Sequence, residues 1–116
     1  MATYKIPLSE YEIECIETVR SLIEKDLSQR YTIEDLGSFA GMSPTKLKTG
    51  FKVYYGLNVF AYVKAKRLNL AFELVCHSHN SLKKIAQLTG YKYLSHFNTA
   101  FKRRFLVTAS RMRRGS

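Results

Sequence analysis

The sequence predicts an all-α fold of seven helices, arranged as two helix-turn-helix subdomains joined by a long linker helix. Three observations lead to this prediction: apolar residues recur at helical spacing along the chain, capping residues and glycines bracket short apolar segments, and one helix pair occurs twice. The 116 residues are expected to form one domain. Subdomain one covers about residues 9–56, the linker helix about 58–77 and subdomain two about 81–114.

The first subdomain is expected to hold three helices. Ser9 opens a capping box at the start of the first helix, and Thr32 caps a short second helix that stops at Gly41. Ser43, followed by proline at the first helical position, starts a third helix that stops at Gly56. The residues expected to face the core of the second and third helices are Leu36, Phe39, Ala40, Leu47, Phe51 and one of Tyr54 and Tyr55.

The linker helix is expected to run from Asn58 to about His77, followed by a polar loop. In the second subdomain, Ser81 caps a fifth helix that stops at Gly90. A sixth helix is predicted over residues 94–105, without a good capping residue before it, and a short seventh over 108–113. The residues expected to face the core here are Leu82, Ile85, Leu88, Phe97, Ala100, Phe101 and Phe105.

An internal repeat carries most of the fold prediction. Residues 32–41 read TIEDLGSFAG, residues 81–90 read SLKKIAQLTG, and the helices that follow align with one additional residue in the second turn. Two short helices that cross closely need a small residue, which Gly37 and Ala86 supply, and a sharp turn, which Gly41 and Gly90 supply. The alternative, a pair of ordinary helical hairpins, is disfavoured because both copies have a polar, basic outer face.

The outer face of the second helix in each copy is polar at helical spacing. Its residues are Thr45, Lys48, Thr49 and Lys52 in the first copy and Ser95, Asn98, Thr99 and Lys102 in the second. A linker helix of about 20 residues is about 30 Å long, close to the roughly 34 Å between successive major-groove windows on one face of B-DNA. A single chain is therefore expected to reach two adjacent windows.

Charge is distributed unevenly along the chain. The formal net charge is +10, from 19 lysines and arginines against 9 aspartates and glutamates. Residues 1–36 contain eight acidic and four basic side chains, whereas residues 37–116 contain fifteen basic ones and a single acid, Glu73. Such a field attracts polyanions, so nucleic acid is the expected partner and an anionic membrane surface is the competing one.

The cysteine positions and the hydropathy of the chain indicate in which cellular compartment the protein is located. Cys15 and Cys76 lie far apart and outside any CxxC pair, which favours a reducing cytoplasm over a disulfide framework. No apolar run reaches the roughly 20 residues that span a bilayer, and the first residues lack the apolar core of a signal peptide. The sequence therefore predicts a soluble, cytoplasmic protein that does not act at a membrane.

Two stretches of the sequence are distinctive. One runs from Ile85 through Gly90 to residues 96–105, HFNTAFKRRF, and the other is the pattern of Tyr62, Arg67, Leu68, Ala71 and Leu74 along the linker helix. On these stretches, residues from about Ser9 to Arg114 resemble the AraC/XylS family of bacterial transcription regulators. The resemblance implies a sequence-specific regulator, without enzyme activity or a cofactor, that binds double-stranded promoter DNA asymmetrically through two helix-turn-helix subdomains.

The resemblance also implies which residues contact DNA. Base contacts are expected from Thr45, Lys48, Thr49, Leu94, Ser95, Asn98 and Thr99. Phosphate contacts are expected from Ser43, Lys46, Lys52, His96, Lys102, Arg103 and Arg104. The family often has arginine at the positions of Thr49 and Thr99, glycine at Leu106 and proline at Ala109. The base preference and the last turn are therefore expected to differ here.

Several alternatives stay open. Family members often carry an effector-binding, dimerising domain, so this chain is either a stand-alone short member or a fragment of a longer regulator. As a fragment it is expected to be monomeric. The acidic residues Glu17, Glu24 and Asp26 form either a solvated face or a contact for RNA polymerase. Residues 111–114 are expected to follow phosphates or to be disordered. The competing function is a non-specific, nucleoid-type or RNA-binding module.

Metal and enzyme chemistry are not expected. Cys76, His77 and His79 supply three donors within four residues, an arrangement that rarely forms a tetrahedral metal site by itself, so a solvated loop is predicted. Some DNA-repair alkyl-acceptor proteins contain an AraC-like unit with a reactive cysteine in a Pro-Cys-His-Arg setting. Here Val75 and Ser78 flank the Cys-His pair, so that motif fails.

Overall fold

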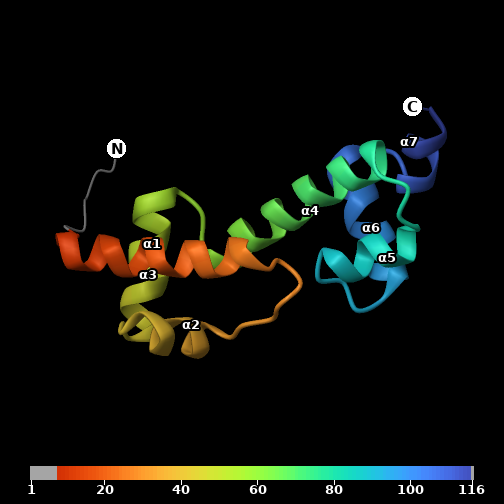
Figure 1. The fold of residues 1–116 in the computed structure, drawn as a ribbon. Coiled ribbons are helices and arrows are strands. Elements are labelled where there is room, and N and C mark those ends of the chain that lie inside the picture. Colours follow the sequence, from red (N-terminus) through yellow and green to blue (C-terminus); the bar gives the residue numbers. More distant parts are fainter. Residues whose placement is uncertain (1–7, 116) are drawn as a thin grey trace. The chain divides into compact units, whose positions relative to one another are not determined.

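The computed structural model describes residues 8–115, and every regular element among them is a helix (Figure 1). The helices are α1 (Glu10–Lys25), α2 (Ile33–Ala40), α3 (Pro44–Tyr55), α4 (Val59–His77), α5 (Leu82–Leu88), α6 (Leu94–Phe105) and α7 (Ala109–Gly115). The predicted all-α class and its seven helices are confirmed. The predicted ends of the helices lie within about two residues of the observed ones, the usual uncertainty of a helix end.

The described chain divides into two compact units. Unit 1 comprises residues 8–26 and 30–63, and unit 2 comprises residues 27–29 and 64–115. Helix α4 is continuous and belongs to unit 1 up to Val63 and to unit 2 from Lys64. Each unit contains one copy of the repeat and its own buried core.

In unit 1, helices α1, α2 and α3 pack against one another in pairs. Gly50 in α3 permits a close contact with α1, because a Cβ atom at this position would lie 2.9 Å from Ile16 Cδ1. The buried apolar side chains of unit 1 are Cys15, Ile16, Val19, Ile23, Leu36, Met42, Leu47, Phe51 and Val59. Removing these side chains from water is the main stabilising term for a unit of this size.

The turn between α2 and α3 leaves no space for a side chain on Gly37. A Cβ atom there would lie 2.6 Å from the carbonyl oxygen of Met42, while the Met42 N–H donates to the Gly37 carbonyl at 2.9 Å. Gly41 has φ +77°, a left-handed conformation that favours glycine. The small residue and the turn glycine of the first copy thus have the roles predicted for them.

Unit 2 repeats this turn with one change. The N–H of Tyr91 donates to the carbonyl of Ala86 at 2.8 Å, and Gly90 has φ +85°. Helix α6 begins four residues after Gly90, whereas α3 begins three residues after the equivalent Gly41. The additional residue predicted in the second turn is therefore confirmed.

The expectation that Phe39 and Leu88 face the core is wrong. Phe39 is 58% exposed and Leu88 is 37% exposed. The two residues occupy the same position of the repeat, and both lie beside the inward face of their helix. In α2 that face consists of Ile33, Leu36, Gly37 and Ala40. A helix of two turns buries one narrow stripe, and this stripe is complete without Phe39.

The core of unit 2 is built from the second half of α4, α5, α6 and α7. Its buried members are Ala71, Val75, Ile85, Ala86, Phe97, Phe101 and Ala109. Thr89 is also fully buried, and its hydroxyl donates to the carbonyls of Ile85 and Ala86. This bond satisfies the hydroxyl inside an apolar core, where an unpaired polar group would be destabilising.

The disorder considered for residues 111–114 is wrong, and the side chain of Arg113 bonds to the protein itself. Residues 111–114 lie within α7, and the guanidinium of Arg113 donates to four carbonyls: Leu74 at 3.1 Å, Val75 at 3.1 Å, Ser78 at 3.2 Å and Asn80 at 2.6 Å. The last carbonyls of a helix lack partners within the helix. Arg113 therefore caps the end of α4 and holds the loop that follows it.

Arg67 of α4 also binds backbone carbonyls, those of the segment 27–29 in unit 2. Its guanidinium donates to the carbonyls of Leu27 and Gln29, both at 2.9 Å. A Cβ atom on Gly90 would lie 2.6 Å from Arg67 Nε and 2.8 Å from the Leu27 oxygen. Glycine is thus required at this position for its backbone conformation and for the space that Arg67 occupies.

The last helix of each repeat copy, α3 or α6, ends at a C-cap residue with the same backbone conformation but a different side chain. The C-cap of α3 is Gly56 at φ +82°, and the C-cap of α6 is Leu106 at φ +71°. Each donates its N–H to the carbonyl four residues earlier. Leu106 is therefore a side-chain-bearing residue in a glycine conformation, and it is 81% exposed.

Replacing Leu106 by glycine is expected to stabilise unit 2 by about 1 kcal/mol. The left-handed conformation costs a residue with a Cβ atom roughly 1–2 kcal/mol, and the greater freedom of glycine in the unfolded chain offsets part of that gain. Thermal unfolding followed by circular dichroism measures the change. Gly56→Ala is the matched control in unit 1 and is expected to destabilise; lower melting temperatures for both variants would contradict the assignment.

Replacing Arg113 by lysine is expected to lower the free energy of unfolding by about 2 kcal/mol. A lysine cannot reproduce several donors in one plane, so some buried carbonyls lose their partner. Urea titration monitored by circular dichroism measures the loss. Arg111→Lys, at an exposed position of the same helix, should change stability by less than about 0.5 kcal/mol; equal effects of both substitutions would argue against the cap.

Candidate nucleic-acid interface

Helix α3 presents the first predicted reading face. The Ser43 hydroxyl caps the helix by accepting from the Lys46 N–H at 3.2 Å, and proline occupies the first position. Leu47, Gly50 and Phe51 are buried on one side of the helix. The predicted base and phosphate residues on the outer side are all exposed: Thr45, Lys46, Lys48, Thr49 and Lys52.

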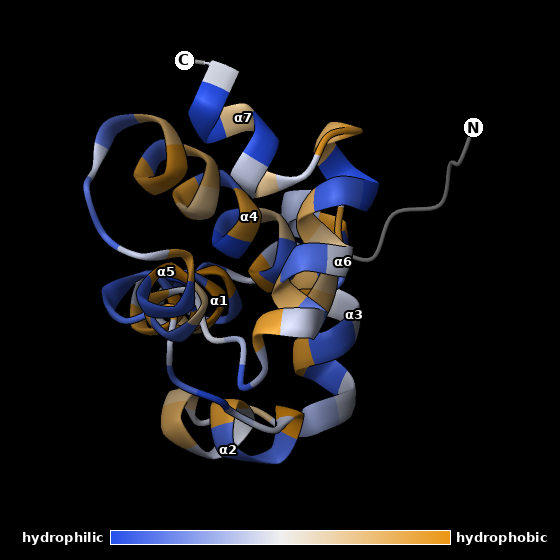
Figure 2. Cartoon of the chain, turned by 90° about the vertical axis from the view of Figure 1, so that its right-hand side faces the viewer, coloured by the Kyte–Doolittle hydropathy of each residue, from blue (hydrophilic) through white to orange (hydrophobic). Residues whose placement is uncertain are grey.

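Helix α6 presents the second predicted face. Phe97 and Phe101 are buried, so the outer side carries the predicted contact residues Leu94, Ser95, His96, Asn98, Thr99, Lys102, Arg103 and Arg104, all exposed. Figure 2 shows how polar and apolar residues alternate along α3 and α6. In each helix a buried apolar pair four residues apart, Leu47 and Phe51 in α3 and Phe97 and Phe101 in α6, fixes which side faces outward.

The start of α6 lacks a side-chain cap, as predicted. No side chain accepts a hydrogen bond at its N-cap Tyr93. Instead, the ring of His96 meets the Tyr93 ring edge-on, with centroids 5.3 Å apart. Among the outer residues, the Thr99 hydroxyl donates to the Ser95 carbonyl at 3.0 Å. Thr99 therefore offers a base an acceptor and a methyl group rather than a donor.

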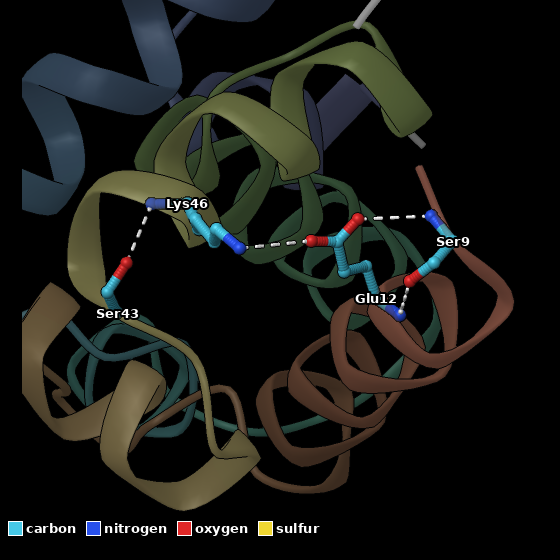
Figure 3. A network of polar contacts seen from close by, with 4 residues as sticks. All are labelled: Ser9, Glu12, Ser43 and Lys46. Atoms are coloured by element: carbon cyan, nitrogen blue, oxygen red, sulfur yellow. Dashed lines mark hydrogen bonds and ion pairs between the residues drawn. The ribbon is translucent and has the colours of Figure 1, made fainter. Parts of the chain in front are cut away.

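Lys46 is the one predicted phosphate residue of α3 that pairs with an acid. Its Nζ lies 3.5 Å from Glu12 Oε2, and the other Glu12 oxygen accepts from the Ser9 N–H at 3.0 Å (Figure 3). The Ser9 N–H, and then the Lys46 ammonium, hold the pKa of the Glu12 carboxyl below its usual value. The predicted capping box is thus confirmed, and it places a carboxylate beside the outer face of α3.

A shallow depression adjoins this ion pair. Its volume is about 290 Å³, and Thr45 and Thr49 of the predicted reading face line it together with Leu8, Glu12, Met42, Lys46 and Gly50. All of these residues belong to unit 1. The reading face of α3 is therefore continuous with the first turn of α1, a neighbourhood that the sequence pattern did not predict.

Acidic residues of α1 bond to tyrosines of α3 and α4. The Tyr54 hydroxyl donates to Glu17 at 2.9 Å, and the Tyr62 hydroxyl donates to Glu24. Burial, followed by the bond to Glu24, raises the pKa of Tyr62 to about 12. These bonds hold α3 and the first turns of α4 against α1, so Glu17 and Glu24 have internal partners.

Known proteins share this arrangement. A family of helix-turn-helix domains matches residues 36–115. The C-terminal domain of AraT, a response regulator from Geobacillus stearothermophilus, superposes with a TM-score of 0.82 at 28% identity, over 96% of this chain and 89% of that one. The probable transcriptional regulator LumQ from Photobacterium leiognathi is 30% identical over 93 residues, which are 80% of this chain and 38% of LumQ.

The chain belongs to the AraC-type helix-turn-helix family. The resemblance noted in the sequence is therefore confirmed, and with it the DNA-binding fold of this class of transcription regulators. The chain spans less than half of the length of LumQ. Residues 8–115 contain no helix that is both long and apolar enough to cross a bilayer.

One AraC-type relative combines regulation with an enzyme activity. It is the bifunctional transcriptional activator/DNA repair enzyme AdaA from Bacillus subtilis, 25% identical over 112 residues, which are 97% of this chain and 51% of AdaA. In the present chain Cys15 is buried in α1 and Cys76 is half-buried in α4. Neither cysteine lies on the outer face of α3 or α6.

Replacing Glu12 by glutamine is expected to strengthen binding to random duplex DNA by about two- to five-fold at low salt, the range of an exposed ion pair. Glutamine keeps the capping box but removes the charge that competes with phosphate for Lys46. Fluorescence anisotropy measures the affinity. In a Lys46→Gln background the same substitution should have a much smaller effect, and an equal gain in both backgrounds would contradict the proposed competition.

Proposed function

We propose that this AraC-type chain is a sequence-specific transcription regulator that binds double-stranded promoter DNA, with α3 and α6 as its two recognition helices in adjacent major-groove windows. One observation carries the proposal: both helices bury large apolar side chains on one side and expose polar and basic residues on the other. An α-helix with such a face fits the major groove of B-DNA.

The exposed residues divide into two classes. Lys48 and Asn98 are the proposed base contacts of highest specificity, because lysine can donate to guanine and asparagine can bond adenine through two atoms. Thr45, Thr49, Leu94, Ser95 and Thr99 are proposed to contribute weaker base contacts. Ser43, Lys46, Lys52, His96, Lys102, Arg103 and Arg104 are proposed to contact phosphates.

The burial of three phenylalanines in the recognition helices supports a duplex partner rather than single-stranded RNA. RNA-binding modules commonly expose aromatic rings on which bases stack. Here Phe51, Phe97 and Phe101 are fully buried. These phenylalanine rings pack in the core and are not available for stacking on bases.

Compartment, enzyme activity, partners and oligomeric state complete the proposed function. We propose that the chain acts in the cytoplasm without enzyme activity, because its cysteines are free and half-buried or buried and Cys76 lacks the alkyl-acceptor motif. RNA polymerase is proposed as a second partner, through Glu17, Glu24 and Asp26, which are exposed although the first two also accept hydrogen bonds from tyrosines. Binding of duplex DNA is proposed to need neither a cofactor nor a metal ion. The DNA-binding chain is proposed to be monomeric.

Replacing Asn98 by alanine is expected to weaken binding to the operator by about 5- to 100-fold, the range of one bidentate base contact, while binding to random duplex changes little. The operator is first obtained by capturing genomic fragments on the protein at near-physiological salt. Lys102→Gln is the contrasting variant and should weaken both duplexes equally. Equal affinity of the unsubstituted protein for operator and random DNA would overturn the proposed function.

A further inference from the structure

The two units carry opposite net charges. The described residues of unit 1 contain eight acidic and six basic side chains, a formal charge of −2. Those of unit 2 contain one acidic and twelve basic side chains, a formal charge of +11 with histidines neutral. The positive charge of the chain therefore resides in unit 2, although both units present a predicted recognition helix.

The reversal of charge occurs at equivalent positions of the repeat. Glu34 and Asp35 occupy the first turn of α2, and Lys83 and Lys84 occupy the same positions of α5. The two helices otherwise share the same buried positions, with Leu36 matching a buried isoleucine in α5. The difference thus lies in the exposed surface and not in the fold.

The lysines of α5 do not stabilise their own helix. Acidic residues are favourable in the first turn of a helix because the free N–H groups there are partly positive, and basic residues are unfavourable. In α2, Asp35 completes a capping box with Thr32. In α5, by contrast, the first turn has no acid, and Lys83 and Lys84 are exposed without an ion pair among residues 8–115. Their charge is available to an external anion.

The recognition helix of unit 2 is also more basic than that of unit 1. Arg103 and Arg104 near the end of α6 are exposed, and their equivalents in α3 are Val53 and Tyr54. The Tyr54 hydroxyl is bonded to an acid of α1. Lys46 in α3 is likewise paired with a glutamate. Unit 1 thus pairs Lys46 internally and lacks the equivalents of Arg103 and Arg104, so it presents fewer unpaired charges to solvent than unit 2.

We propose that unit 2 is the electrostatic anchor of the complex with DNA, with Lys83 and Lys84 of α5 contacting phosphates beside the predicted contacts of Lys102, Arg103 and Arg104. Unit 1 adds base discrimination and fewer phosphate contacts, so it contributes less to the salt dependence. The first helix of a helix-turn-helix crosses the DNA backbone, which places its exposed side near phosphates. This proposal rests on the proposed function, since it assigns unequal roles to the two units of one DNA-binding chain.

Salt dependence tests the anchor without knowledge of the operator. Binding to a random duplex of about 30 base pairs is measured by fluorescence anisotropy between about 50 and 200 mM KCl, where each lost phosphate contact reduces the slope of log K against log salt by about 0.9. Lys83→Gln and Lys84→Gln are each expected to reduce the slope by about this amount. The matched control is Lys25→Gln, an exposed lysine of unit 1 with the same change in charge, and its slope should not change.

Two further measurements separate loss of binding from loss of structure. The melting temperatures of Lys83→Gln and Lys84→Gln should be unchanged or raised, because each substitution removes an unfavourable charge from the first turn of α5. Glu34→Lys places a lysine at the position in α2 equivalent to Lys83, and it should make the slope steeper by about 0.9.

An unchanged slope for both α5 variants, the same reduction for Lys25→Gln, or an unchanged slope for Glu34→Lys would overturn the anchor. Failure of the proposed function has a different signature. The chain would then bind operator and random duplex equally, while the salt slopes on random duplex would keep the order given above.

Discussion

Both recognition faces depend on one close backbone contact at the turn that precedes each recognition helix. In unit 1 the Met42 N–H donates to the carbonyl of Gly37, and a Cβ atom on Gly37 would lie 2.6 Å from the Met42 carbonyl oxygen. In unit 2 the Tyr91 N–H donates to the carbonyl of Ala86, whose single methyl group is buried at the equivalent position. This contact fixes the direction in which the second helix leaves the turn. That direction determines which side of α3 and α6 is buried and which is exposed, because the large apolar side chains of each helix must lie on the buried side.

The two copies use this common frame differently. In unit 1, acids of α1 bond to side chains of α3 and α4, as in the pairs of Glu17 with Tyr54 and of Glu12 with Lys46. In unit 2, Arg67 and Arg113 donate to backbone carbonyls, whereas Lys83, Lys84, Lys102, Arg103 and Arg104 are exposed. A guanidinium suits this role because it offers several donors in one plane and stays charged. Unit 2 can therefore hold a strongly positive surface on a stable core.

The fold could be predicted from the sequence because its signals are local. Caps, glycines and helical spacing lie within a few residues of one another, and the repeat places them twice. The outward positions of Lys48 and Asn98 follow from the same spacing. Contacts between distant residues could not be predicted: Arg113 bonds to a carbonyl 38 residues earlier and Lys46 to an acid 34 residues earlier. Phe39 was misplaced because apolar character alone does not show how wide the buried stripe of a two-turn helix is.

Two non-equivalent recognition helices in one chain are proposed to read one DNA site. Selection of bound duplexes from a random pool, followed by sequencing, is the most direct test. An asymmetric motif with two different conserved segments about one helical turn apart is expected. The outer faces of α3 and α6 share only a threonine and a lysine at equivalent positions, Thr49 with Thr99 and Lys52 with Lys102, and differ elsewhere. A palindromic motif, a single conserved segment or no enriched sequence would contradict it.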